Sequence, residues 1–487
     1  MKLERTPKLG ALVFALVFAT TTLYDANRAR ARAPVSRDVQ RKLDRWLEHR
    51  ALSGLRVGVA VADLKSGELI ASHRAHEVLN PASGAKLVTT AAALKLLGPT
   101  HAWFTSFGLS GSSLQITGGG DPKLLPEEIG PIIDKVAKKL KAQQIGQVDA
   151  IRMDLSRYDS HQLPPAYAQK GTDAGYRPAI GAAGTSYGAI RVDVRPTRVG
   201  YPVEVSLNPA TSIEIINEGV TSRGKKSSLT IEATPITGGW VRLLVRGELG
   251  VEHSPDWVRR RIPDPNRLTA ELVRDALTAR GLADATTPMI LHRAPPKNSQ
   301  RKSPIELYRH PSDDLTKTVD DINTWSNNYM AEVVFKELGK APGHAASWER
   351  AAPRITKTLA DWGVSPAEMR VVNGSGLYRG TLISTNAMTQ LLVAVDKSAD
   401  LATPFRESLA RPGRAGTLSG RLKSPAARDR VWAKTGTLDE VVSLAGYIHT
   451  SGDHGLAFAI FINDADASRT GALRSAIDRL VLTLSRL

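Results

Sequence analysis

The stretch Asn80-Pro-Ala-Ser-Gly-Ala-Lys-Leu-Val-Thr-Thr90 decides how this chain of 487 residues is interpreted. Within it, Ser83 and Lys86 stand three residues apart, where a loop passes into an apolar helix. Side chains at i and i+3 share one face of a helix, so the Lys86 amine can reach the Ser83 hydroxyl. An unprotonated amine there could take the hydroxyl proton and make Ser83 a nucleophile. The spacing alone is weak evidence, because an N-cap serine followed by a solvated lysine gives the same pattern.

Two further motifs follow along the chain in the order that this chemistry requires. Ser326-Asn327-Asn328 opens an apolar run of helical character, and Lys434-Thr435-Gly436-Thr437 comes shortly before the apolar stretch 441–448. A Ser-x-x-Lys, a Ser-x-Asn type element and a Lys-Thr-Gly together are the signature of β-lactamases and penicillin-binding proteins. Taken singly, Ser326 is explained as a helix cap and the Lys-Thr-Gly as a strand-to-turn element. Together, in this order, the three motifs favour a serine acyl-transfer site.

Several shorter runs add to the three motifs: Gly118-Gly-Gly-Asp-Pro122, Ala331-Glu332, Asn373-Gly-Ser-Gly-Leu377 and Leu444-Ala-Gly-Tyr447. With these residues the chain resembles the low-molecular-mass penicillin-binding proteins of the D-alanyl-D-alanine carboxypeptidase/endopeptidase group, which carry a long insert between their first two motifs. Ser83 and Ser326 are 326 − 83 = 243 residues apart, which is similar to this group. One departure is Asn373, where the family usually has an aspartate.

The resemblance implies catalytic roles for three side chains. Ser83 would attack the carbonyl of the penultimate D-alanine and become acylated. Lys86 would be its base, which requires burial and the neighbouring charge of Lys434 to lower the pKa of Lys86 well below 10. Ser326 would relay a proton toward the leaving amine. The backbone N–H groups of Ser83 and Thr437 would form the oxyanion hole.

The remaining implied roles concern substrate binding. Asn328 would bind the substrate's amide, and the Lys434-Thr435-Gly436-Thr437 segment would bind its terminal carboxylate, with positive charge from Lys434 and hydrogen bonds from Thr435 and Thr437. Ser375 lacks the flanking glycines of a hydrolase elbow, and we expect it to be at most a pocket-lining residue. Glu332 and Glu337 stand at helical spacing, which predicts surface or salt-bridged side chains.

The resemblance, together with strands near both ends of the chain and a terminal helix, implies an α/β (α+β) fold. The expected β-lactamase/transpeptidase-like domain has an antiparallel sheet flanked by helices, an all-helical region, and a β-rich insert. We assign residues 34–104 and 289–487 to the catalytic domain, and residues 105–288 to the insert, in two subdomains. Residues 1–33 place basic residues before a short apolar run, as in an export signal or an N-terminal anchor.

Composition narrows the setting in which the protein works. The chain has 65 basic and 48 acidic residues, which gives a formal charge of +17. The basic residues are scattered, which argues against nucleic acid and fits a carboxylate-rich polymer or an anionic membrane surface. There is no cysteine, and the 11 histidines show no metal-ligand spacing. We expect neither a metal nor another cofactor, and we expect export to the periplasm or cell envelope with peripheral membrane or cell-wall association.

These observations predict a serine-type D-alanyl-D-alanine carboxypeptidase, a D,D-endopeptidase, or both, acting on peptidoglycan stem peptides through an acyl-enzyme. β-Lactam antibiotics are the expected inhibitors, and nucleic acid is not an expected partner. Two alternatives stay open from the sequence. One is a β-lactamase or esterase on the same scaffold, and the other is a catalytically idle cell-wall-binding protein.

Overall fold

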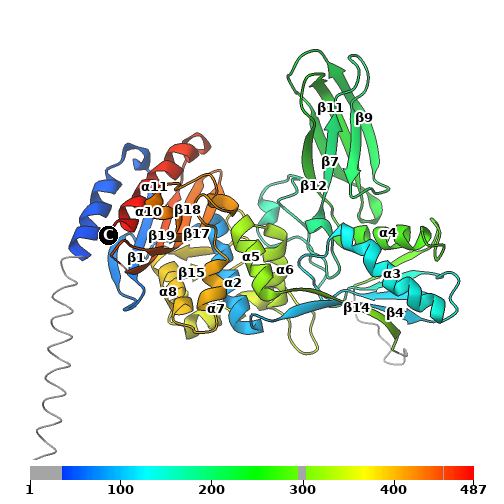
Figure 1. Ribbon diagram of the computed structural model, residues 1–487, viewed down its shortest axis with the longest axis horizontal. Helices are drawn as coiled ribbons and strands as arrows, with labels where there is room; N and C mark the ends of the chain where they lie inside the picture. Colours follow the sequence, from blue (N-terminus) through cyan, green and yellow to red (C-terminus); the bar gives the residue numbers. More distant parts are fainter. Residues whose placement is uncertain (1–35, 294–302, 453) are drawn as a thin grey trace, which may run out of the picture.

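A five-stranded antiparallel sheet joins the two ends of the chain in the computed structural model, which describes residues 36–293, 303–452 and 454–487 (Figure 1). The strand order is β17-β18-β19-β1-β2. The bounds are β1 (Arg56–Asp63), β2 (Leu69–His73), β17 (Val431–Leu438), β18 (Val441–His449) and β19 (Gly455–Asn463). Because β1 pairs with β19, residues far apart in sequence form one sheet, as in Val59 beside Ile460, 401 positions later (460 − 59). The expected export segment, residues 1–33, lies outside the described residues.

Helices cover both faces of this sheet. A helix over residues 36–47 and α11 (Thr470–Ser485) share one hydrophobic core with the sheet. On the other face, α8 (Thr385–Asp396) packs against β1, β18 and β19. The helix α2 (Ala85–Leu97) follows Ser83, and its residues 85–94 are all buried, which confirms the core position that its apolar sequence predicts.

The helix α2 is buried because three helices of the middle of the chain pack around it: α5 (Leu315–Trp325), α6 (Asn328–Glu337) and α7 (Trp348–Asp361). Its alanines let these neighbours approach closely. The smaller elements of this region are β3 (Val78–Leu79), β15 (Met369–Arg370), β16 (Leu382–Ser384) and α9 (Ala402–Glu407). The short helix α10 (Pro425–Arg428) packs against α11. The sheet with flanking helices and a helical region confirms the predicted α/β fold class.

A second sheet lies at the lower right of the molecule in Figure 1. Its order is β13-β6-β5-β4-β14, and α3 (Pro126–Ala142) and α4 (Pro265–Thr278) pack together beside it. The bounds of its strands are β4 (Ala102–Ser110), β5 (Ser113–Thr117), β6 (Ile151–Asp154), β13 (Met289–His292) and β14 (Ile305–Asp314). The sheet therefore extends from residue 102 to residue 314, and the expected boundaries at 104/105 and 288/289 both fall inside it.

The strand β14 lies within residues 289–487, the range that we assign to the catalytic domain, and Pro311 and several charged residues give its sequence a weak strand signal. Among the strands that the structure describes, β14 pairs with β4 alone and lies at the edge of the sheet, where proline and charge are tolerated. The helix α3 was also missed in a region expected to be β-rich. Its buried residues do follow helical spacing: Ile129, Ile132, Ile133, Val136 and Leu140.

A third part of the molecule, between α3 and α4 in sequence, projects upward in Figure 1. It consists of two three-stranded sheets, β10-β11-β9 and β12-β7-β8, that enclose a separate core. The bounds are β7 (Ala189–Arg195), β8 (Glu204–Asn208), β9 (Glu214–Ser222), β10 (Thr230–Pro235), β11 (Val241–Gly250) and β12 (Asp256–Arg261). Among the helices that the structure describes, none is both long and apolar enough to cross a lipid bilayer.

Candidate active site

Ser83 lies in a short 3-10 turn, Ala82–Gly84, immediately before α2. Asn80 holds this turn, because its Oδ1 accepts from the Ala82 backbone N–H at 2.8 Å and its Nδ2 donates to the Tyr378 carbonyl at 2.8 Å. The strand β17 presses against the same turn at Gly436, where a Cβ would stand 2.5 Å from the Pro81 carbonyl oxygen. Only glycine permits this approach, so the Lys-Thr-Gly strand lies directly beside Ser83.

Lys86 is one turn further along and is fully buried. Its Nζ lies 2.9 Å from Ser83 Oγ, 2.7 Å from Asn328 Oδ1 and 2.9 Å from the Ser375 carbonyl oxygen. The two carbonyl-type oxygens can only accept hydrogen bonds. When Lys86 is an unprotonated amine, its two N–H bonds are therefore directed to Asn328 and Ser375, and its lone pair faces the Ser83 hydroxyl.

The Ser326-Asn327-Asn328 motif forms the junction between α5 and α6. Ser326 ends α5 with left-handed backbone angles, φ 62° and ψ 36°, and Asn327 caps α6 by accepting from the Met330 N–H at 3.1 Å. The first residue of α6 is Asn328, whose Nδ2 donates to the Tyr176 carbonyl at 2.8 Å. That bond fixes the orientation of the amide, so its oxygen faces Lys86.

Burial sets the protonation of the two motif lysines. It lowers the pKa of Lys86 to about 7, while the negative charge of Glu332 acts in the opposite direction. Burial also lowers the pKa of Lys434 well below its usual range, and the charge of Lys86 adds to this effect. A protein interior disfavours two close ammonium groups, so the pair favours loss of a proton.

The Lys-Thr-Gly strand places its side chains alternately on two sides. Lys434 is buried, and its Nζ donates to the Thr435 carbonyl at 3.0 Å. The Thr435 hydroxyl donates to Thr417 Oγ1 at 2.8 Å, and Thr437 Oγ1 accepts from the Arg474 guanidinium at 3.1 Å. Lys434, for which we expect a role in supplying positive charge to the substrate, has no exposed surface.

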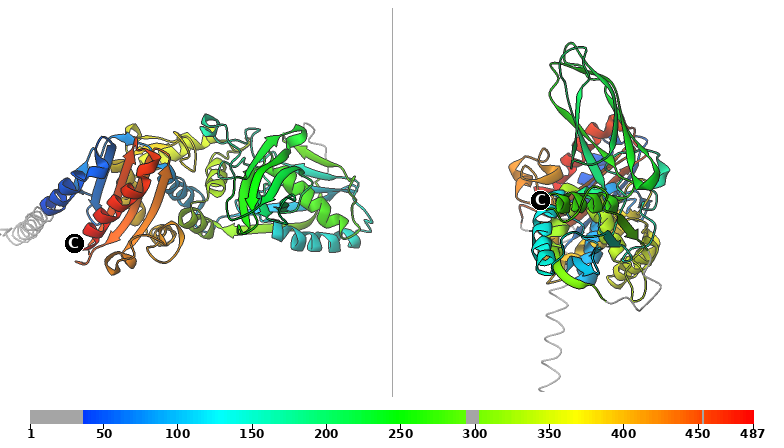
Figure 2. Two further views of the ribbon diagram at one scale, coloured as in Figure 1. Left: turned by 90° about the horizontal axis from the view of Figure 1, so that it is seen from above. Right: turned by 90° about the vertical axis from the view of Figure 1, so that its right-hand side faces the viewer.

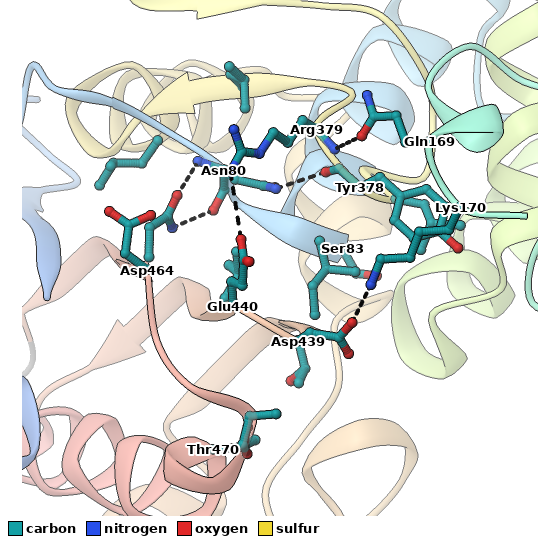
Figure 3. A pocket seen from close by; sticks show the side chains of 18 of the residues that line it. Asn80, Ser83, Gln169, Lys170, Tyr378, Arg379, Asp439, Glu440, Asp464 and Thr470 are labelled. Atoms are coloured by element: carbon teal, nitrogen blue, oxygen red, sulfur yellow. Dashed lines mark hydrogen bonds and ion pairs between the residues drawn. The ribbon is translucent and has the colours of Figure 1, made fainter.

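A pocket of about 830 Å³ opens above these groups (Figure 3). Its lining includes one or more residues of each motif and of the insert, namely Ser83, Ser326, Asn328, Thr437, Gln169, Lys170 and Tyr176. Lys86 and Lys434 lie beneath it. The structure thus brings together three sequence segments separated by up to 351 positions (434 − 83).

Two ion pairs connect opposite rims of this pocket. Lys170, from the insert, pairs with Asp439 in the turn between β17 and β18. Arg379, from the segment between β15 and β16, lies 3.7 Å from Glu440 in the same turn. Figure 3 shows Lys170 reaching Asp439 beside Ser83. All four side chains are well exposed, so solvent and salt screen both pairs.

Ser375 and Glu332 differ from expectation. The Ser375 side chain is buried beneath the pocket, and its contribution to the site is the carbonyl that accepts from Lys86. Glu332 is fully buried and forms no surface ion pair. Its carboxylate accepts from the N–H groups of Gly374 and Ser375 at 3.1 and 2.8 Å and from Trp348 Nε1 at 2.9 Å. Glu332 therefore holds the loop that positions Lys86.

Glu337 matches its expected role, since it lies 2.6 Å from Arg157 in a salt bridge. Sequence reasoning missed two contributions to the site: the carbonyl of Tyr176 and the hydroxyl of Tyr167, which contacts Ser375 Oγ at 2.8 Å. A backbone carbonyl leaves no signal in a single sequence. In the described ranges, no three His, Cys, Asp or Glu side chains gather closely enough to hold a metal ion.

Comparison with known proteins agrees with this geometry. Residues 39–484 match the D-Ala-D-Ala carboxypeptidase 3 (S13) family. A D-alanyl-D-alanine carboxypeptidase from Actinomadura sp. (strain R39) is 29% identical over 96% of this chain and 87% of its own length. A second relative, the D-alanyl-D-alanine carboxypeptidase DacB of Haemophilus influenzae, is 22% identical over 97% of this chain and 95% of its own.

The fold has a counterpart among solved structures. The crystal structure of penicillin binding protein 4 from Haemophilus influenzae superposes with a TM-score of 0.76 at 20% identity, and the match covers 93% of this chain and 99% of that one. The same protein complexed with a β-lactam superposes with a TM-score of 0.71. At this level of identity the likeness establishes the shared architecture, including the insert.

Proposed function

Because the chain belongs to the D-Ala-D-Ala carboxypeptidase 3 (S13) family, we propose that it removes the terminal D-alanine from peptidoglycan stem peptides through an acyl-enzyme on Ser83. The observation that carries the proposal is the 2.9 Å contact between Lys86 Nζ and Ser83 Oγ, with Lys86 buried and its pKa lowered to about 7. At neutral pH a substantial part of Lys86 is then an amine, which is what a base for a hydroxyl nucleophile must be.

Acylation follows from the hydrogen bonds of Lys86. Its lone pair accepts the Ser83 proton while Ser83 Oγ bonds to the carbonyl carbon of the penultimate D-alanine. The charge that develops on the carbonyl oxygen is stabilised by the backbone N–H groups of Ser83 and Thr437. Thr437 belongs to β17, an edge strand, and edge strands present unpaired backbone groups. Each such donor lowers the activation barrier by about 3–4 kcal/mol.

Collapse of the tetrahedral intermediate breaks the peptide bond and expels D-alanine, whose amine needs a proton. We assign this transfer to Lys86 and Ser326, with Ser326 at the pocket wall as the relay. Water then attacks the ester carbonyl, Lys86 again accepts a proton, and the shortened peptide leaves with Ser83 restored. Asn328 bonds the substrate's amide. Thr437 and Thr435 bond the terminal carboxylate, Thr435 after its hydroxyl has turned from Thr417 to the substrate.

A fluorescent penicillin tests the nucleophile. We expect it to label the parent covalently and to leave Ser83→Ala unlabelled. Equal labelling of Ser83→Ala would overturn the assignment. Persistent label on the parent supports this function, whereas rapid loss of label supports the alternative of a β-lactamase.

Mass spectrometry of peptidoglycan fragments tests the substrate. Release of D-alanine from pentapeptide stems is expected, and loss of crosslinked dimers would add the D,D-endopeptidase activity. A labelled protein that alters neither kind of fragment would support an idle cell-wall-binding protein. We place the enzyme in the cell envelope, because residues 2–19 have the basic-then-apolar order of an export segment.

A further inference from the structure

Arg474 approaches the Lys-Thr-Gly strand from a different element, the C-terminal helix α11. This helix begins at Thr470, which lines the pocket, and Arg474 follows one turn later on the same side. Its Nη2 donates to Thr437 Oγ1 at 3.1 Å. Side chains alternate between the two faces of a strand, so Thr437 lies on the same face of β17 as Ala433. Ala433 belongs to the hydrophobic core that α11 covers. Thr437 is therefore directed toward this helix.

The charge of Arg474 is not neutralised by a neighbour. Within the described residues, no carboxylate lies within ion-pair distance of its guanidinium. The adjacent Arg421, in contrast, is paired with Asp478 at 2.7 Å. Lys434, the other cation near Thr437, has no exposed surface and directs its Nζ to a backbone carbonyl. A solvent-accessible positive charge beside Thr437 therefore comes from α11.

The hydrogen bond between Arg474 and Thr437 also orients the hydroxyl. A threonine hydroxyl donates one hydrogen bond and accepts two. Because Arg474 donates to Thr437 Oγ1, the hydroxyl's own proton is free to point toward the pocket. Arg474 uses one of its five N–H groups in this bond, and the others match the planar fork geometry of a carboxylate.

We propose that Arg474 binds the terminal carboxylate of the substrate together with the Thr437 hydroxyl, and that it supplies the positive charge of this subsite from outside the three motifs. The inference rests on the proposed function and extends it. Arg474 is a binding residue for the substrate's free acid and takes no part in proton transfer.

The test compares acylation of the purified protein by benzylpenicillin and by its methyl ester, which lacks the carboxylate charge. Arg474→Gln should lower the second-order rate constant for the acid about 10- to 100-fold, the usual range for a hydrogen bond to a charged group. The rate with the ester should stay close to the parent's. Arg474→Lys keeps the charge but loses the fork, so it should recover part of the acid rate.

Arg479→Gln is the matched control, because it removes the same charge from the same helix on a side that contacts His49. It should leave the acid-to-ester ratio of the parent unchanged. Equal losses for acid and ester in Arg474→Gln, or no loss for either, would overturn the inference while the function stands. A parent that neither compound acylates would overturn the proposed function and this inference with it.

Discussion

At the scale of single residues, the reactivity that we propose for Ser83 depends on the protonation of one buried amine. Two opposing influences act on Lys86: burial, the larger, disfavours its charge, and the buried carboxylate of Glu332 favours it. Because Asn328 and Ser375 each present a fixed acceptor, loss of one proton leaves only the direction of Ser83 for the lone pair. Geometry and electrostatics thus select the same reactive state.

The first prediction concerns pH. Acylation of Ser83 by penicillin should rise with pH through a midpoint near 7, since the folded-state pKa of Lys86 is lowered from 10.5 to about 7. Stability should change in the same direction. Between pH 7 and 10.5 the unfolded chain binds one more proton at Lys86 than the folded chain, so this residue makes the free energy of unfolding rise with pH there. Stopped-flow acylation rates measured across this range check the midpoint, and a profile flat through neutrality would contradict it.

The second prediction separates the charge of Glu332 from its hydrogen bonds. In Glu332→Gln the negative charge that raises the pKa of Lys86 is gone, so the acylation midpoint should move to lower pH. The new amide nitrogen cannot accept from its neighbours, so the maximal rate should also fall and stability should drop by about 1–3 kcal/mol. The same pH series of acylation rates gives the midpoint and the maximal rate, and urea unfolding gives the change in stability.

Glu337→Gln is the control for this experiment. It removes the same charge from the same helix, but its partner is Arg157 and it contributes nothing to the pKa shift of Lys86. Its acylation midpoint should match the parent's. If Glu337→Gln and Glu332→Gln moved the midpoint equally, the effect of Glu332 could not be attributed to its place beside Lys86.

At the scale of elements, the junction of α5 and α6 places two motif residues. Ser326 adopts left-handed angles at the end of α5, and α6 begins two residues later. This tight reversal lets Ser326 and Asn328 both face the pocket. Such a backbone conformation is costly for a non-glycine residue, so its neighbours must hold it.

The third prediction tests the cap that helps to hold this junction. Asn327→Ala loses the hydrogen bond to the Met330 N–H and should destabilise the protein by about 1 kcal/mol. Asn327→Asp keeps a capping oxygen and adds a charge that the helix N-terminus favours, so it should be close to the parent. Thermal unfolding of both variants provides the comparison, and an equal loss in Asn327→Asp would argue against a capping role.

The elements that the sequence predicted are those with a strong local pattern. The helix after Ser83 and the strands near both ends of the chain, which are β1, β18 and β19, are apolar runs long enough to need a buried position, and the structure confirms them. The apolar residues of α3 repeat with the helical period of 3.6 residues, but the strand-like runs around this helix dominate the local sequence. The angles of Ser326 and the carbonyl of Ser375 depend on tertiary contacts, and a single sequence carries no sign of them.

At the scale of the whole molecule, the insert completes the pocket around Ser83. Residues 162–178 extend from the insert to this pocket. There Tyr167 is fully buried and contacts Ser375, and the Tyr176 carbonyl accepts a hydrogen bond from Asn328. Asn373 strengthens this contact, because its Nδ2 donates to the Pro165 carbonyl at 2.9 Å. An aspartate, the usual residue of the family, could not donate there. The sequence predicted that an insert exists, but its role in the pocket appears only when distant segments are brought together.

The last prediction contrasts a buried and an exposed link within this segment of the insert. Tyr167→Phe removes a hydroxyl that contacts Ser375 Oγ at 2.8 Å and Glu332 at 3.4 Å, and it leaves their buried oxygens with one partner fewer. We expect a loss of about 1–3 kcal/mol in stability and slower acylation, because the same loop positions Lys86. Lys170→Ala, three residues away, removes the exposed pair with Asp439 and the contact of the Lys170 ammonium with the Tyr378 ring, 5.7 Å from its centroid. The ion pair contributes at most about 1 kcal/mol and is screened by salt. Urea unfolding at low and high salt distinguishes the two variants. If Lys170→Ala destabilised the protein as much as Tyr167→Phe at both salt concentrations, the surface pair rather than the buried tyrosine would be what docks the insert onto the catalytic region.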